Sequence, residues 1–156
     1  MVEFSPKTKE KFKAIQAKYP EKGAALLPAL WLAQQEFSAI TPEVEEYVAR
    51  LVGVSPVRVN EVLSFYTMYT PKPLGTYHLQ LCTNISCSLL GAEDLLEYLK
   101  KKLNVNPGET TPDGKFTLSA VECLGHCGTA PAMQINDDFH ENLTEESIDK
   151  ILDLLK

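Results

Sequence analysis

The chain has 156 residues, a formal net charge of −6 and a hydrophobic content of 44%, values that are ordinary for a globular protein. Residues 77–156 carry six Lys/Arg against thirteen Asp/Glu, and because an acidic surface repels phosphate backbones, nucleic acid is excluded as a partner class. The longest apolar stretch, GAALLPALWLA, is far shorter than the roughly 20 residues that span a bilayer, and the N-terminus lacks a secretory pattern, so we expect a cytoplasmic protein without direct membrane insertion.

Residues 1–72 are predicted to form a helical N-terminal domain, a bundle of about four helices. Three of these helices have the start signal of a capping Ser or Thr followed by proline, at Ser5-Pro6, Thr41-Pro42 and Ser55-Pro56. Another helix is expected from Ala24 to Phe37. The last helix is expected to bury Val59, Val62, Leu63 and Tyr66.

A junction rich in proline and glycine, TPKPLG at 70–75, separates this domain from residues 73–156. After it, alternation of apolar residues predicts a strand from Tyr77 to Cys82, and 3.6-residue periodicity predicts a helix over 91–103. Two further strands are expected over 116–121 and 132–136, with a short fourth strand over 139–142 and a final helix capped by Thr144. The order β-α-β-β-α is that of a small thioredoxin-like sheet, so the fold class is α+β.

All four cysteines follow predicted strands, in the stretches LQLCTNISCSLLG and VECLGHCGTAPAM. In a reducing cytosol, four thiols at such spacing favour metal ligation or redox chemistry over disulfides. Two-residue gaps are typical of structural zinc sites, whereas the gaps of four and three residues here suit a binuclear iron–sulfur cluster, in which each pair holds a different iron. Gly91, Gly125 and Gly128 should let backbone N–H groups point at sulfur and stabilise a reduced cluster.

Other interpretations of the four thiols stay open at this point. They are a zinc site in a structural or adaptor subunit, a set of free structural thiols, and a 4Fe–4S cluster, which more often uses C-x-x-C spacing. A dithiol redox pair is disfavoured because the chain contains no C-x-x-C.

The segments CTNISCSLLGAEDLL, TPDGKFTLSAVECLGHCGTAPAMQIND and VLSFYTMY resemble the 2Fe–2S subunit of NADH–quinone oxidoreductase (respiratory complex I). The resemblance covers nearly the whole chain and includes the pattern C-x4-C followed by C-x3-C. It implies that Cys82, Cys87, Cys123 and Cys127 ligate one 2Fe–2S cluster in a thioredoxin-like domain, with Cys82 and Cys87 on one iron and Cys123 and Cys127 on the other.

The resemblance also implies a function in one-electron transfer within the peripheral arm of complex I. The partner is the flavoprotein subunit that binds FMN and NADH, and this chain has no dinucleotide fingerprint G-x-G-x-x-G of its own. Assembly would place the chain on the cytoplasmic side of the inner membrane. The same module occurs in soluble NAD-linked hydrogenases and formate dehydrogenases, which are the alternative parent enzymes.

Two predictions concern residues outside the cysteine set. Apolar residues near the end of the helical domain are candidates for contact with the partner, although packing within the bundle explains them equally well: Leu63, Phe65, Tyr66, Met68 and Tyr69. His126 departs from the small residues usual in this family, and the favoured interpretation is a solvent-facing side chain; the alternative is a cation that tunes the cluster potential. His78 and His140 are not expected to be ligands.

Overall fold

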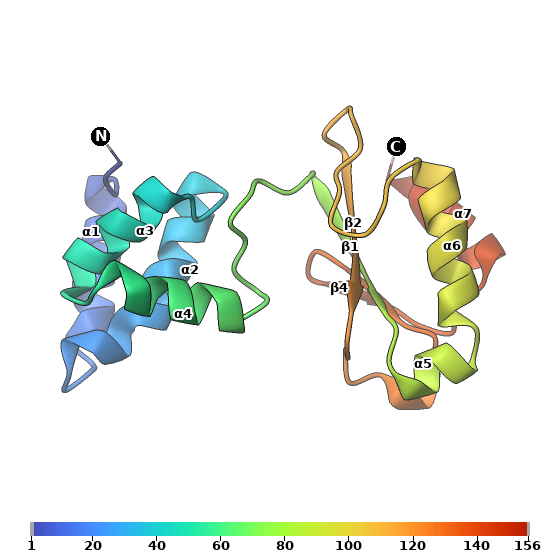
Figure 1. The fold of residues 1–156 in the computed structure, drawn as a ribbon, viewed down its shortest axis with the longest axis horizontal. Coiled ribbons are helices and arrows are strands. Elements are labelled where there is room, and N and C mark those ends of the chain that lie inside the picture. Colours follow the sequence, from blue (N-terminus) through green and yellow to red (C-terminus); the bar gives the residue numbers. More distant parts are fainter. Residues whose placement is uncertain (1, 156) are drawn as a thin grey trace. The chain divides into compact units, whose positions relative to one another are not determined.

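The computed structural model of the protein describes residues 2–155, which form two compact units that divide between Pro73 and Leu74 (Figure 1). Helices make up the first unit, and a sheet with helices makes up the second, so the predicted α+β class is confirmed. That residues 1–72 and 73–156 are separate domains stays a prediction. Within residues 2–155, no helix has the length and apolar character needed to cross a membrane.

Within residues 2–73, the first unit contains four α-helices and one 3-10 turn (Figure 1). Their bounds are α1 (Pro6–Gln16), the 3-10 turn Lys22–Ala25, α2 (Leu26–Phe37), α3 (Pro42–Val52) and α4 (Pro56–Phe65). Ser5 and Ser55 cap α1 and α4 by accepting hydrogen bonds from the backbone N–H of Thr8 and Arg58, as the sequence predicts. Thr41 makes no capping bond and instead donates its hydroxyl hydrogen to Glu43 at 2.7 Å.

The end of α4 differs from the prediction at Tyr66, which is 38% exposed rather than buried. The helix ends at Phe65, and Tyr66 has an extended backbone, so it leaves the helical face that Val59, Val62 and Leu63 bury. Tyr69 is buried, and its hydroxyl donates a hydrogen bond to the Leu27 carbonyl at 2.8 Å.

The second unit is a four-stranded sheet in the order β2-β1-β3-β4 with three helices. Its elements are β1 (Tyr77–Cys82), α5 (Ile85–Leu89), α6 (Ala92–Leu103), β2 (Phe116–Val121), β3 (Met133–Ile135), β4 (Asp138–His140) and α7 (Glu145–Leu154). β1 pairs with β2 in parallel and with β3 antiparallel, and β3 pairs with β4 antiparallel. Figure 1 shows α6 and α7 on the same side of the sheet.

The core of this unit lies between the sheet and these two helices. Leu79 and Leu118, which are register partners on β1 and β2, are fully buried there with Leu99 of α6 and Ile148 of α7. Alternation places His78 on the opposite face of the sheet, where its Nε2 atom lies 2.8 Å from the Ser119 hydroxyl. Burial lowers the pKa of His78, which favours the neutral ring.

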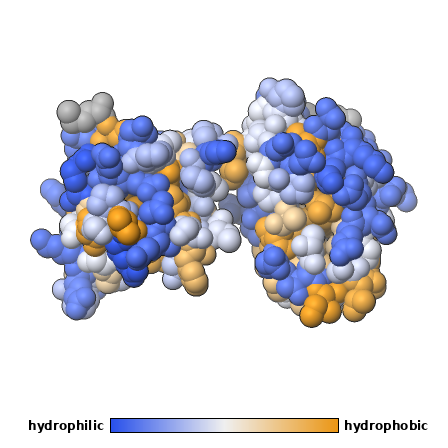
Figure 2. Space-filling model, viewed as in Figure 1, coloured by the Kyte–Doolittle hydropathy of each residue, from blue (hydrophilic) through white to orange (hydrophobic). Residues whose placement is uncertain are grey.

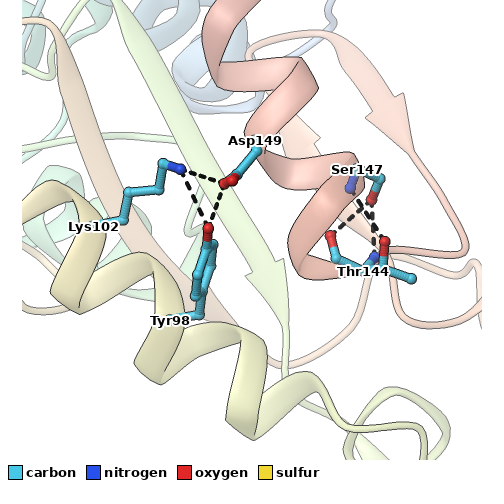
Figure 3. Close-up of polar contacts among 5 residues, drawn as sticks. All are labelled: Tyr98, Lys102, Thr144, Ser147 and Asp149. Atoms are coloured by element: carbon cyan, nitrogen blue, oxygen red, sulfur yellow. Dashed lines mark hydrogen bonds and ion pairs between the residues drawn. The ribbon is translucent and has the colours of Figure 1, made fainter.

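Polar contacts join α6 to α7 and cap the start of α7 (Figure 3). The Tyr98 hydroxyl and the Lys102 ammonium group, both on α6, donate hydrogen bonds to the Asp149 carboxylate on α7. The hydrogen bond to Asp149 raises the pKa of Tyr98. At the start of α7, Thr144 and Ser147 form a reciprocal capping box: the Ser147 N–H donates to Thr144 Oγ1 at 3.2 Å, and the Thr144 N–H donates to Ser147 Oγ at 2.9 Å.

Replacing Thr144 by alanine removes the hydroxyl acceptor of this capping box. We expect Thr144→Ala to lower the free energy of unfolding by about 1 kcal/mol, the usual effect of losing an N-cap side chain. Urea denaturation followed by circular dichroism measures the change. Thr144→Ser keeps the hydroxyl and should behave nearly as the parent; an equal loss in both variants would show that the cap does not contribute.

Candidate metal centre

The four cysteines line one pocket of about 260 Å3 at an edge of the sheet. Cys82 is the last residue of β1, and Cys87 lies in α5. Cys123 follows β2, and Cys127 begins the 3-10 turn Cys127–Thr129. Because β1 and β2 are parallel and Cys82 pairs with Val121, both strands end at the same edge, and the two cysteine loops start side by side.

The two cysteine pairs have different environments. Cys82 and Cys87 are buried in a small apolar cluster with Ala92 and Ala130, and Val121 and Leu124 pack against it. Cys123 and Cys127 are exposed. The first pair is therefore fixed in the protein interior, whereas the second pair forms the outer wall of the pocket.

Backbone hydrogen bonds hold the loop that runs from Cys82 to Cys87 in place. The Cys82 N–H donates to the Ala132 carbonyl at 3.0 Å, and the Thr83 N–H donates to the Val121 carbonyl at 2.9 Å. Asn84 then caps α5, its side-chain oxygen accepting from the Ile85 N–H at 2.7 Å. The helix has only five residues and two serines, so it has no apolar periodicity and was not predicted.

Two backbone features bear on the sulfur atoms directly. Gly125 has a φ of 78°, a conformation that favours glycine, and its N–H donates to the Cys123 sulfur at 3.3 Å. This is one of the N–H···S contacts that the sequence predicted. The Cys82 thiol in turn donates to the Glu122 carbonyl at 3.7 Å.

Burial raises the pKa of Cys87, and a backbone hydrogen bond at Ala132 opposes this shift. The thiol therefore keeps its proton at neutral pH in the metal-free protein, and metal binding must release that proton. The other pocket residues are Asn84, Ile85 and Ser86, so the only titratable groups among the lining residues are the four thiols. A donor set of thiolates alone suits zinc or an iron–sulfur cluster.

Among the residues that the structure describes, no group of three or more His, Cys, Asp or Glu side chains is placed to hold a metal ion, although the four cysteines share one pocket. The choice between zinc and an iron–sulfur cluster therefore rests on the spacing of the cysteines and not on this geometry.

His126 lies between the two cysteines of the second loop but is not a free surface residue. Its ring stacks on Phe139 of β4 with the ring centroids 4.4 Å apart, and its Nδ1 atom contacts the Glu141 carboxylate. The side chain is 30% exposed, so it faces solvent in part, as predicted, but it also has two specific partners that the prediction did not include. Nothing in the sequence around position 126 signals partners 13 and 15 residues away.

The fold and the four thiols at one end of the sheet place this chain in a class of small thioredoxin-like proteins with a cysteine-lined site. The chain belongs to the thioredoxin-like [2Fe-2S] ferredoxin family, whose model matches residues 12–156.

Relatives within this family are similar over most of the chain. An NADH-quinone oxidoreductase subunit of Rhizobium meliloti is 48% identical over 145 residues, which are 93% of this chain and 86% of the relative. NADH-quinone oxidoreductase subunit 2 of Thermus thermophilus is 49% identical over 139 residues, 87% of this chain and 77% of the relative. The predicted resemblance to a subunit of this oxidoreductase is thus confirmed.

A solved structure shares the fold at lower sequence identity. The NAD+-reducing [NiFe]-hydrogenase in its H2-reduced state matches with a TM-score of 0.70 and 20% identity, over 81% of this chain and 22% of the hydrogenase chain. The assignment of Cys82, Cys87, Cys123 and Cys127 as the ligands stays a prediction.

The exposed pair offers a direct test of that assignment. We expect Cys123→Ser and Cys127→Ser each to lose most of the bound iron and sulfide while keeping the circular dichroism of the parent, because both side chains lie outside the packed core. Iron and sulfide assays on anaerobically purified protein measure the loss. Ser86→Ala, which changes a pocket residue without removing a sulfur, should retain the cluster; retention in the cysteine variants would contradict the assignment.

Proposed function

We propose that this chain is the electron-transfer subunit of an NADH–quinone oxidoreductase, in which Cys82, Cys87, Cys123 and Cys127 hold one 2Fe–2S cluster for single-electron exchange with FMN. In this proposal FMN and NADH bind to a partner flavoprotein subunit, and the assembled chain lies on the cytoplasmic side of the inner membrane. The observation that carries the proposal is the single pocket lined by all four thiols. Relatives that are 41–49% identical and bear the name of this oxidoreductase support it.

A 2Fe–2S centre, when bound, supplies one-electron chemistry at a potential on the order of −400 mV when all its ligands are cysteines. The protein contributes the environment of the sulfurs. Burial of Cys82 and Cys87 keeps water from one side of the pocket, and the Gly125 N–H stabilises negative charge on the Cys123 sulfur. The exposed pair leaves the other side open towards a redox partner.

An apolar rim beside the pocket supports the idea of a partner protein. Ile85 is 74% exposed and also lines the pocket, and Leu89 at the end of α5 is 82% exposed. Leu90 follows with 59% exposure. In Figure 2, hydrophobic colour covers the end of this unit where Figure 1 places α5. Clustered exposed apolar side chains mark surfaces for protein contact, and a contact here would bring a flavin close to the pocket.

The predicted docking residues in the first unit divide into two groups. Leu63 and Tyr69 are buried and pack the helical core. Phe65, Tyr66 and Met68 are exposed and remain candidates for contact with the partner.

Charge placed on the apolar rim should weaken the complex. We expect Leu89→Asp to raise the Kd for the flavoprotein subunit about tenfold or more, because a charge would be buried in an apolar contact. Calorimetry or surface plasmon resonance on the anaerobic holoprotein measures the Kd. The matched control is Leu154→Asp on α7, a leucine that is 86% exposed but lies outside this rim; equal weakening by both would count against the rim as the contact surface.

Coexpression with the flavoprotein subunit tests the function as a whole. The anaerobic complex should be reddish-brown, and NADH should generate the paramagnetic signal of a reduced 2Fe–2S cluster within it. A colourless chain with bound zinc would indicate a structural subunit instead. Copurification with hydrogenase or formate dehydrogenase subunits, rather than with membrane subunits, would indicate one of the soluble parent enzymes.

A further inference from the structure

We propose that His126, Phe139 and Glu141 form a clamp that holds the second cysteine loop, residues 122–128, against β4 and so slows loss of the cluster. This inference rests on the proposed function, because it assumes that Cys123 and Cys127 are ligands. All three residues are positioning residues: they act on the loop that carries the ligands.

Two contacts of different kinds meet on one imidazole ring. The His126 ring lies over the Phe139 ring at an interplanar angle of 27°, with the centroids 4.4 Å apart. The Nδ1 atom of the same ring contacts the Glu141 carboxylate. A neutral ring protonated at Nδ1 and a charged ring both donate to this carboxylate, so the contact forms with either form of the ring.

Apart from this contact, the loop is attached by Leu124, which packs against the apolar cluster around Cys82 and Cys87, and by the Cys82 thiol, which donates to the Glu122 carbonyl at 3.7 Å. Before the loop, the Val121 carbonyl accepts a hydrogen bond from Thr83. After it, the Asn142 N–H donates to the Thr129 carbonyl at 2.8 Å, and the Leu143 N–H donates to the Pro131 carbonyl at 3.1 Å. Within residues 122–128, all of which the structure describes, His126 is the only residue whose own side chain forms a hydrogen bond to a residue outside the loop.

The clamp lies beside the pair of cysteines that has the fewest packing contacts. Cys82 and Cys87 are buried in the apolar cluster, but Cys123 and Cys127 are exposed and lie outside it. His126 directly precedes Cys127, so fixing its ring limits how far the Cys127 backbone can move. An outward swing of this loop is the shortest route by which the outer pair could release a metal.

The test is the rate at which anaerobic holoprotein loses its visible absorption in excess iron chelator. His126→Ala should lose the cluster about threefold to tenfold faster than the parent, the effect expected when one aromatic contact is removed. Phe139→Leu and Glu141→Ala should shift the rate in the same direction. Glu141→Gln keeps an oxygen acceptor for Nδ1–H and should restore most of the slow rate.

A double variant distinguishes a clamp from general destabilisation of the protein, because substitutions that break the same contact do not have additive effects. The double variant His126→Ala/Glu141→Ala should lose the cluster no faster than His126→Ala alone, because both changes break the same contact. The matched control is His140→Ala, which changes a histidine on β4 that takes no part in the clamp and should leave the rate unchanged. If His126→Ala fails to fold, the Phe139 and Glu141 variants carry the test.

Unchanged rates in the single variants, or rates that add in the double variant, would overturn the clamp while leaving the proposed function intact. A parent protein without iron and sulfide would instead overturn the proposed function, and the clamp with it. The two failures are therefore distinguishable in one preparation.

Discussion

Parallel pairing of β1 with β2 is the constraint on which the site depends. The register runs from Tyr77–Phe116 to Cys82–Val121, so both strands end together. The two cysteine loops, which are separated by 35 residues of sequence, therefore leave the sheet at the same edge. A slip of one residue would turn the Cys82 side chain to the other face of the sheet and remove it from the pocket.

The packing beneath the sheet protects that register. Leu79 and Leu118 are paired in register and fully buried against α6 and α7, so the alignment of the strands is tied to burial of the largest apolar cluster in the second unit. The same strand register is therefore needed both for packing of the core and for the geometry of the site. The pocket itself combines an interior pair of thiols with an exterior pair, an asymmetry that suits a redox centre close to the surface.

Much of this architecture could be predicted from the sequence. Proline and cap signals located α1, α3 and α4, and alternation located β1 and β2, because these elements have one apolar face and clear ends. The predicted ends of β1 and β2 placed the two cysteine pairs at the carboxyl ends of these strands. The exposed position of Tyr66 was missed because it depends on where α4 ends, and α5 was missed because five residues are too few for periodicity. The contacts of His126 with β4 arise only from tertiary structure.

The central claim is that four cysteine sulfurs hold a pair of bridged irons, and X-ray absorption at the iron edge of anaerobic protein tests it most directly. The account predicts a first shell of sulfur atoms alone around iron, together with a short iron–iron vector. A shell that contains nitrogen or oxygen, or a protein whose bound metal is zinc with no iron–iron vector, would contradict it.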